Sequence, residues 1–204
     1  LNKETIINDL HKVMISEESD TPIRQNCLGS LQKFSLRPIP QKKLIDLDIL
    51  GWCISTLITE QVTVSDYTLE YCLALIMNLS LSSKGRDRCV KYSSSLLKVI
   101  FNYINSDSIH IRTCINGTLY SVLKKKAVKE EAKVKGLQEV LEGKLSDRNE
   151  QIRKQTEYIV EELKREEEEV VEENKESPDN KVDHDFQDEW GVDILEEAYE
   201  DDCN

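Results

Sequence analysis

A short polar motif recurs along this chain at intervals of a little over forty residues, and each copy is followed by apolar residues at helical spacing. Three copies pair Ser-Asp with a later Ile-Arg, and one copy is degenerate. A short hydrogen-bond acceptor such as Asp stabilises the N-terminal end of a helix, so each motif predicts the start of a helix. The copies are Ser19–Arg24, Ser65–Leu69, Ser106–Arg112 and Ser146–Arg153.

Within each motif, the Asp is predicted to cap the helix. The Ile is predicted to begin the buried apolar stripe of the helix, and the Arg to lie on the flank of that stripe. The predicted caps are Asp20, Asp66, Asp107 and Asp147. Small residues share one aligned position in three of these helices, which would let a neighbouring helix come close. They are Gly29, Ala74 and Gly117.

The predicted stripes begin at Ile23, Thr68, Ile111 and Ile152, which lie 45, 43 and 41 residues apart. A period in the forties that contains only helices is typical of armadillo and HEAT solenoids. Between copies, the pattern predicts a short helix and then an apolar one. Three helices per unit favour the armadillo type over the two-helix HEAT type.

The fold class is therefore predicted to be all-α, an armadillo-type right-handed α-solenoid of about three to four repeats over residues 1–165. The chain begins with Leu1, which we interpret as a fragment that starts inside a repeat. Pro38 and Pro40 are expected to break the chain after Leu36. Helices besides the four capped ones are expected at 3–15, 41–47, 51–60, 83–91, 95–105, 125–135 and 137–145.

Charge divides the chain into a mildly basic body and an acidic end. From Glu157 onward there are 21 acidic and 4 basic residues, and the preceding 156 residues carry 18 acidic and 23 basic ones. This composition predicts that residues 166–204 form an acidic, mostly disordered tail. Phe186, Trp190 and Ile194 share helical spacing there, so 186–199 is either a docking motif or an accidental cluster.

The residues indicate no enzyme, cofactor or metal site. The three histidines have no Cys, Ser or carboxylate partner at a telling interval, and no glycine-rich phosphate loop is present. No apolar run approaches the roughly 20 residues of a membrane span. Aromatic residues do not interleave with the lysines, so nucleic acid is not expected as a partner. The six cysteines are interpreted as reduced thiols in the cytosol.

Three stretches resemble the family of LisH-domain-containing armadillo-repeat proteins of cilia and basal bodies. They are GSLQKFSLRP at 29–38, SDYTLEYCLALIMNLSL at 65–81 and INGTLYSVL at 115–123. The resemblance implies a non-enzymatic protein–protein interaction scaffold in the cytoplasm and cytoskeleton, at the basal body, centriole and ciliary tip. It also implies a full-length protein that dimerises through an upstream segment.

The partners implied by the resemblance are microtubule-associated ciliary proteins of the TOG-array type, with tubulin as a further candidate. The shared activity would be ciliogenesis and the stability of axonemal microtubules. The alternative is a general cytosolic armadillo adaptor that binds an extended peptide of a cargo or adhesion partner. Localisation of the tagged full-length protein would separate the two.

Asn78 is the residue most relevant to that alternative, because an Asn at this place in armadillo helices can hydrogen-bond an extended peptide. The aligned positions are Lys33, Ser121 and Glu162, so a ladder of such residues is absent. Asn78 is either a groove contact or a residue whose side chain bonds nearby backbone.

Lys124, Lys125 and Lys126 form the strongest basic cluster. One interpretation is a solvated junction near a helix C-terminus, where cations are favoured. The other is an electrostatic landing site for acidic tubulin tails or another acidic partner.

Overall fold

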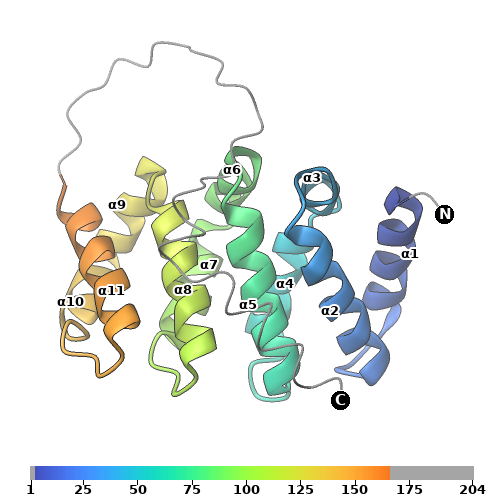
Figure 1. Ribbon diagram of the computed structural model, residues 1–204, viewed down its shortest axis with the longest axis horizontal. Coiled ribbons are helices and arrows are strands. Elements are labelled where there is room, and N and C mark those ends of the chain that lie inside the picture. Colours follow the sequence, from blue (N-terminus) through green and yellow to red (C-terminus); the bar gives the residue numbers. More distant parts are fainter. Residues whose placement is uncertain (1–2, 166–204) are drawn as a thin grey trace, which may run out of the picture.

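The computed structural model describes residues 3–165, and these residues form eleven helices and no strand. The helices stack side by side into one elongated row (Figure 1). In chain order they are α1 (Lys3–Ser16), α2 (Pro22–Ser35), α3 (Pro38–Asp46), α4 (Ile49–Thr59), α5 (Asp66–Ser80), α6 (Ser83–Lys91), α7 (Ser93–Tyr103), α8 (Ile109–Val122), α9 (Lys126–Val134), α10 (Leu137–Glu142) and α11 (Glu150–Lys164).

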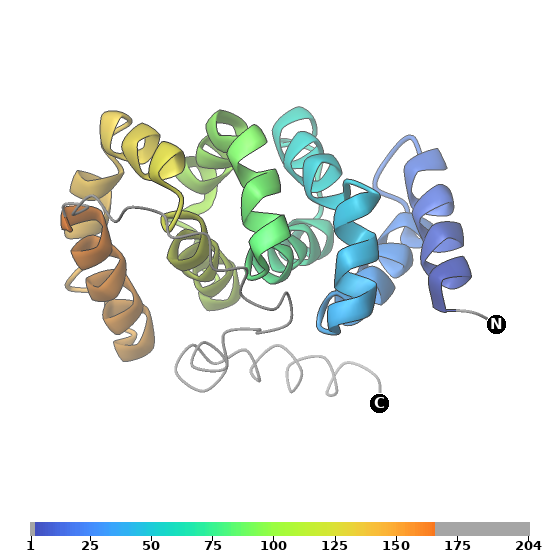
Figure 2. The same cartoon turned by 90° about the horizontal axis from the view of Figure 1, so that it is seen from above.

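The row is built from repeated units. The pair α1–α2 is followed by three units of three helices, α3–α5, α6–α8 and α9–α11. The third helices α2, α5, α8 and α11 pack against one another in sequence along one face, and the short first helices α3, α6 and α9 lie along the upper edge in Figure 1. The second helices α4, α7 and α10 lie behind the third helices in the view of Figure 1, and Figure 2 shows the arrangement from above. This arrangement confirms the all-helical solenoid of three to four repeats.

The third helices carry most of the core because each has helices on several sides. In α5 every residue from Tyr71 to Ser80 is buried, and α5 packs against α2, α4 and α8. Its sequence is accordingly apolar almost all round, which is what a fully surrounded helix requires. The apolar side chains of all repeats join into one continuous core.

The predicted Asp caps are wrong. The residues that cap the third helices are Thr21, Ser65, Ser108 and Asn149, whose side-chain oxygens accept hydrogen bonds from backbone N–H groups three residues later. Asp66 is instead the first residue of α5. The hydroxyl and amide residues hold the cap position because they stand directly before the first helical residue, where the side chain reaches the free amides.

The observed caps change the alignment of the first repeat by one residue. They lie 44, 43 and 41 residues apart, so Arg24 takes the place that Thr68, Ile111 and Ile152 hold in the later helices. Ile23, which was expected to begin the buried stripe, is 54% exposed, while Arg24 is 1% exposed.

The same shift affects the proposed register of small residues. Ala74 and Gly117 lie nine residues after their caps and Gly29 lies eight after its cap, so the three are not equivalent. Gly29 nevertheless makes room for a neighbour. A Cβ at Gly29 would lie 3.0 Å from the hydroxyl of Tyr67 and 3.4 Å from the ring of Tyr71 on α5.

Two prolines begin a helix that they were expected to precede. Pro38 is the first residue of α3 and Pro40 lies in its first turn, so α3 starts three residues before the predicted 41–47. The missing N–H of proline costs nothing at these positions because the first amides of a helix have no partner within it. The other helices follow the predicted segments closely, and α6 has both predicted ends.

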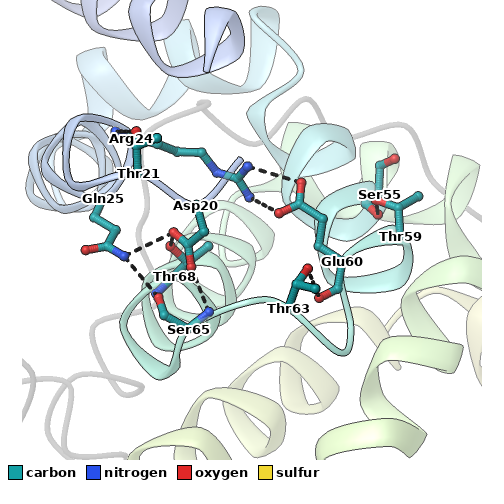
Figure 3. A network of polar contacts seen from close by, with 10 residues as sticks. All are labelled: Asp20, Thr21, Arg24, Gln25, Ser55, Thr59, Glu60, Thr63, Ser65 and Thr68. Atoms are coloured by element: carbon teal, nitrogen blue, oxygen red, sulfur yellow. Dashed lines mark hydrogen bonds and ion pairs between the residues drawn. The ribbon is translucent and has the colours of Figure 1, made fainter. Parts of the chain in front are cut away.

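A polar network joins α2 to the following repeat (Figure 3). Asp20 accepts hydrogen bonds from the backbone N–H of Ser65 at 2.7 Å, the hydroxyl of Thr68 at 2.5 Å and the amide of Gln25 at 3.2 Å. Burial raises the pKa of the Asp20 carboxyl, but these hydrogen bonds outweigh burial and the pKa lies below its usual value. Asp20 therefore helps to begin α5, a helix of the next repeat.

The buried guanidinium of Arg24 completes this junction. Its two terminal nitrogens lie 3.1 and 2.6 Å from the carboxylate oxygens of Glu60, and its Cζ lies 5.1 Å from the centre of the Trp52 ring. A buried cation needs such partners because desolvation is costly. Arg24 thus connects α2 to the end of α4.

The α8–α11 junction uses similar residues differently. Arg112 pairs with Asp147, and the other carboxylate oxygen of Asp147 accepts from the N–H of Asn149 at 2.9 Å. Deeper in the junction, the amide of Asn116 donates to Gln155 at 3.2 Å. Here Asp147 bonds to the cap residue of its own repeat, Asn149, and pairs with Arg112 of the preceding repeat.

Candidate protein-interaction surface

Basic residues are frequent in the short first helices and the residues just before them, and these helices lie along the upper edge of Figure 1. Residues 37–46, 83–91 and 124–135 have balances of +2, +3 and +4, from three cations against one acid, four against one and six against two. We call these three segments the basic edge. The third helices α2, α5 and α8 end beside it, and the carbonyl ends of helices favour cations.

Ion pairs between successive repeats neutralise part of the basic edge. Lys84 pairs with Asp46, Arg88 lies 3.8 Å from Asp48, and Lys125 lies 2.5 Å from Asp87. In each pair the acid belongs to the repeat that precedes the cation. Exposed pairs of this kind contribute little stability individually. All three pairs join successive repeats near their first helices.

A pocket of about 420 Å³ opens where α2 ends and α3 begins. It is lined by Ser30, Lys33, Phe34, Arg37 and Pro40. Phe34 and Pro40 provide an apolar floor, while Lys33 and Arg37 are exposed at the rim. Within residues 3–165, no ion pair or side-chain hydrogen bond engages either cation. This α2–α3 pocket therefore suits an apolar side chain that is flanked by carboxylates.

The predicted lysine cluster lies at the α8–α9 junction, with Lys126 as the first residue of α9. The Nζ of Lys124 lies 4.2 Å from the centre of the Tyr120 ring, and Lys125 pairs with Asp87. Nearby Lys129 is buried and lies 3.4 Å from Glu162. The cluster is thus partly engaged inside the solenoid, and binding of an acidic partner there stays a prediction.

The structure corrects the expectation that Asn78 contacts a peptide. Asn78 is 1% exposed, and its amide donates to the hydroxyl of Ser35 at 2.8 Å. Its backbone carbonyl accepts from the side chain of Gln41 at 2.7 Å. Asn78 lies inside because α2 and α3 both pack against α5, so it joins helices of neighbouring repeats.

Tyrosines on the third helices were not singled out from the sequence. The rings of Tyr67 and Tyr71 pack in a tilted arrangement with centres 4.3 Å apart, and the ring of Tyr120 on α8 lies 5.2 Å from that of Tyr158 on α11. Tyr67 and Tyr158 are both 39% exposed. Tyrosine combines a large apolar ring with a polar tip, which is typical of recognition surfaces. The spacing of four residues between Tyr67 and Tyr71 was the available signal, whereas Tyr120 and Tyr158 lie at different positions in their repeats.

The remaining predicted site residues, Phe186, Trp190 and Ile194, lie outside the described residues, as does the whole predicted tail 166–204. Their role as a docking motif stays a prediction.

The chemistry of the described residues is that of packing. Their five cysteines are buried, and burial raises the pKa of the Cys89 and Cys114 thiols to about 12, which disfavours the nucleophilic thiolate. From residue 3 to 165, no group of three or more His, Cys, Asp or Glu residues could hold a metal ion. No helix in that range is long and apolar enough to cross a membrane.

Comparison with known sequences gives a consistent family. The sequence model for the ARM repeats of LisH domain-containing protein ARMC9 matches residues 44–164, more than half of the chain. LisH domain-containing protein ARMC9 of Bos taurus is 36% identical over 155 residues, covering 76% of this chain and 23% of the relative. The protein of that name from Homo sapiens is 37% identical and covers 71% and 18%. The chain spans less than a quarter of these relatives.

Solved structures agree on the fold. A designed armadillo repeat protein in complex with the peptide (KR)4 matches with a TM-score of 0.64 at 13% identity, over 78% of this chain and 64% of that chain. An engineered protein matches with a TM-score of 0.67 at 12% identity, over 79% of this chain and 38% of that chain. These matches confirm the armadillo-type solenoid.

Proposed function

The chain belongs to the family of LisH domain-containing protein ARMC9, and from that premise we propose that it is a non-enzymatic scaffold of the cilium and basal body. The family and the armadillo fold support a protein-interaction scaffold. The ciliary setting is supported by the family resemblance alone, and we propose the basal body, centriole and ciliary tip as the location. There it would act with microtubule-associated partners on axonemal microtubule stability.

The α2–α3 pocket carries the proposal about what is bound. Lys33 and Arg37 are exposed cations that form no ion pair within residues 3–165, and they line the pocket together with the apolar surface of Phe34 and Pro40. The basic edge continues this positive charge across three repeats. A partner segment with an apolar anchor among carboxylates fits both features, since charge steers the encounter and the pocket gives specificity.

The sign of the charge separates this surface from that of a similar structure. The designed armadillo repeat protein is in complex with a basic peptide. In this chain the edge of the solenoid is itself basic, so an acidic segment is the complementary partner. Acidic segments of microtubule-associated proteins and the acidic tails of tubulin belong to this class. The general adaptor that reads peptides through exposed Asn residues is not favoured, because Asn78 is buried.

Binding of labelled peptides to the full chain tests the pocket. The probe is a glutamate-rich peptide with one central Trp, followed by fluorescence anisotropy, and its lysine-rich counterpart is the peptide control. We expect the double variant Lys33→Glu, Arg37→Glu to bind the acidic peptide about tenfold more weakly, because two favourable charges become repulsive. The matched control Lys12→Glu, Lys98→Glu makes the same charge change at exposed residues of α1 and α7.

Equal binding by the two double variants would show that overall charge, and not the pocket, holds the peptide. In cells, the tagged full-length protein with the same substitutions tests the ciliary setting. We expect the Lys33→Glu, Arg37→Glu variant to leave the basal body while the control stays. A parent protein that spreads evenly through the cytoplasm would favour the general adaptor.

A further inference from the structure

We propose that the α2–α3 pocket has an occupant within this chain, the acidic segment 186–199, which binds there in competition with partner proteins. The inference rests on the proposed function, because it assigns a regulator to the same pocket. It commits to one surface and one segment. The alternatives, another surface of the solenoid or a second copy of the chain, are outcomes of the test below.

The segment complements the pocket in charge and in apolar character. Residues 186–199 contain five acidic and no basic residues. Trp190 is the fifth of these residues, with Asp188 and Glu189 before it and Asp193 after it. An apolar ring flanked by carboxylates is the counterpart of an apolar floor flanked by Lys33 and Arg37. Both members would therefore have their charges and apolar surface matched on binding.

Three lysines at the α8–α9 end of the basic edge are less available to the carboxylates of this segment. Lys124 lies over the ring of Tyr120, Lys125 pairs with Asp87, and Lys129 is buried beside Glu162. An incoming carboxylate would have to compete with these contacts. At Lys33 and Arg37 it would meet no such competition within residues 3–165. The observed contacts thus select the α2–α3 pocket over the lysine cluster.

The connection to the segment is long enough. Helix α11 ends at Lys164 on the same upper edge of Figure 1 at which α2 ends. The 20 residues from 166 to 185 can span at most about 70 Å. Three steps between adjacent third helices amount to about 30 Å, because packed helices lie 8–10 Å apart. The segment can therefore reach α2 along the row of third helices.

Tethering makes even a weak contact effective. A binding segment in the same chain acts at an effective concentration of about a millimolar. A partner would have to displace segment 186–199 before it could enter the pocket. The segment would therefore raise the partner concentration that is needed to occupy the pocket. Salt should weaken the internal contact, because charges are screened over a Debye length of about 8–10 Å.

Photo-crosslinking in the full chain locates the segment directly. The variant Trp190→p-benzoylphenylalanine keeps an aromatic group at the anchor and bonds to neighbours within reach on irradiation. We expect crosslinks within one chain to residues 30–40, identified by mass spectrometry. Adding Lys33→Glu and Arg37→Glu should lower their yield about tenfold, whereas Lys12→Glu and Lys98→Glu should not. Circular dichroism confirms that each variant is folded.

Three results would overturn the inference. Crosslinks at Tyr120–Lys126 would move the segment to the lysine cluster. Crosslinks between two chains would make the occupant a second copy. Absence of any solenoid crosslink at low salt would leave the pocket without an internal occupant.

The acidic-peptide titration separates this inference from the proposed function. If both hold, Trp190→Ser should strengthen binding of the external peptide several-fold by freeing the pocket. Crosslinks to 30–40 without any binding of the external peptide would remove the proposed function and keep the internal contact. External binding that is unchanged by Trp190→Ser, with no crosslinks, would do the reverse.

Discussion

The α2–α5 and α8–α11 junctions begin with the same sequence motif, but they bury different residues of that motif. At α2 the third residue after the cap is Arg24, which is 1% exposed, and Ile23 before it faces solvent. At α8 the third residue after the cap is Ile111, which is 5% exposed, and the side chain of Arg112 is 18% exposed. One residue along a helix is a rotation of about 100°.

The difference shows that the position of the cap, and not the recurring letters, sets which side chains enter the core. At α8 the inward residue is apolar and needs no partner. At α2 the inward residue is charged, and its neighbours supply a carboxylate from Glu60 and the ring of Trp52. Substitutions at matched positions of the two junctions test this account.

The largest difference is expected between the two isoleucines. Ile111→Ala should lower the free energy of unfolding by about 2–4 kcal/mol, because it leaves a cavity in the core. Ile23→Ala should change it by less than about 0.5 kcal/mol, because the side chain is exposed. Urea unfolding followed by circular dichroism measures both. Similar losses would mean that the cap-based alignment of α2 is incorrect.

The second-largest difference in the free energy of unfolding is expected between the two arginines. Arg24→Ala is expected to cost about 2–3 kcal/mol, somewhat less than a fully buried pair, because Glu60 keeps 26% of its side chain exposed. Arg112→Ala should cost about 1 kcal/mol, since the side chain of Arg112 is 18% exposed against 1% for Arg24, and Asp147 keeps its hydrogen bond from the N–H of Asn149. The same urea experiment applies. A larger loss at Arg112 would contradict the contrast between buried and peripheral pairing.

The aspartates should show a smaller effect. Asp20→Ala removes an acceptor of three hydrogen bonds and should cost about 1–1.5 kcal/mol. Asp107→Ala should change stability by less than about 0.5 kcal/mol, because Ser108 is the cap of α8. Ser108→Ala supplies the matched loss of about 1 kcal/mol. Thermal melting ranks the three, and a greater loss at Asp107 would restore the Asp caps.

The smallest effect concerns pH. The pKa of Asp20 is lowered in the folded chain, so its contribution is fully present above the unfolded value of 3.8 and is lost as pH falls through the folded pKa. Asp20 is partly exposed, so the contribution should stay below about 1 kcal/mol. The stability gap between the parent and Asp20→Asn should therefore narrow as pH is lowered from 5 to 3. A gap that widens on acidification would reverse the sign.

The fold could be predicted because the period and the apolar stripes repeat, so that several helices supply the same evidence. The caps could not be ranked from the sequence, because Ser, Thr, Asn and Asp all cap well and each observed cap lies within two residues of the predicted Asp. The α2–α3 pocket depends on α3 starting at Pro38, which brings Arg37 and Pro40 beside Phe34. The basic edge was available as a recurring positive balance in the first helices, but only the stacking of those helices makes it continuous.

The reach of Asp20 into the next repeat also has a consequence in time. Its partner Ser65 lies 45 residues later in the chain. Synthesis at about 5–20 residues per second would produce Ser65 roughly 2–9 s after Asp20. Helices α1 and α2 are therefore made before α5, and Asp20 between them offers its carboxylate to a helix that is still to be synthesised. Assembly of the solenoid is thereby given a direction, in which each new unit completes itself against the one already present.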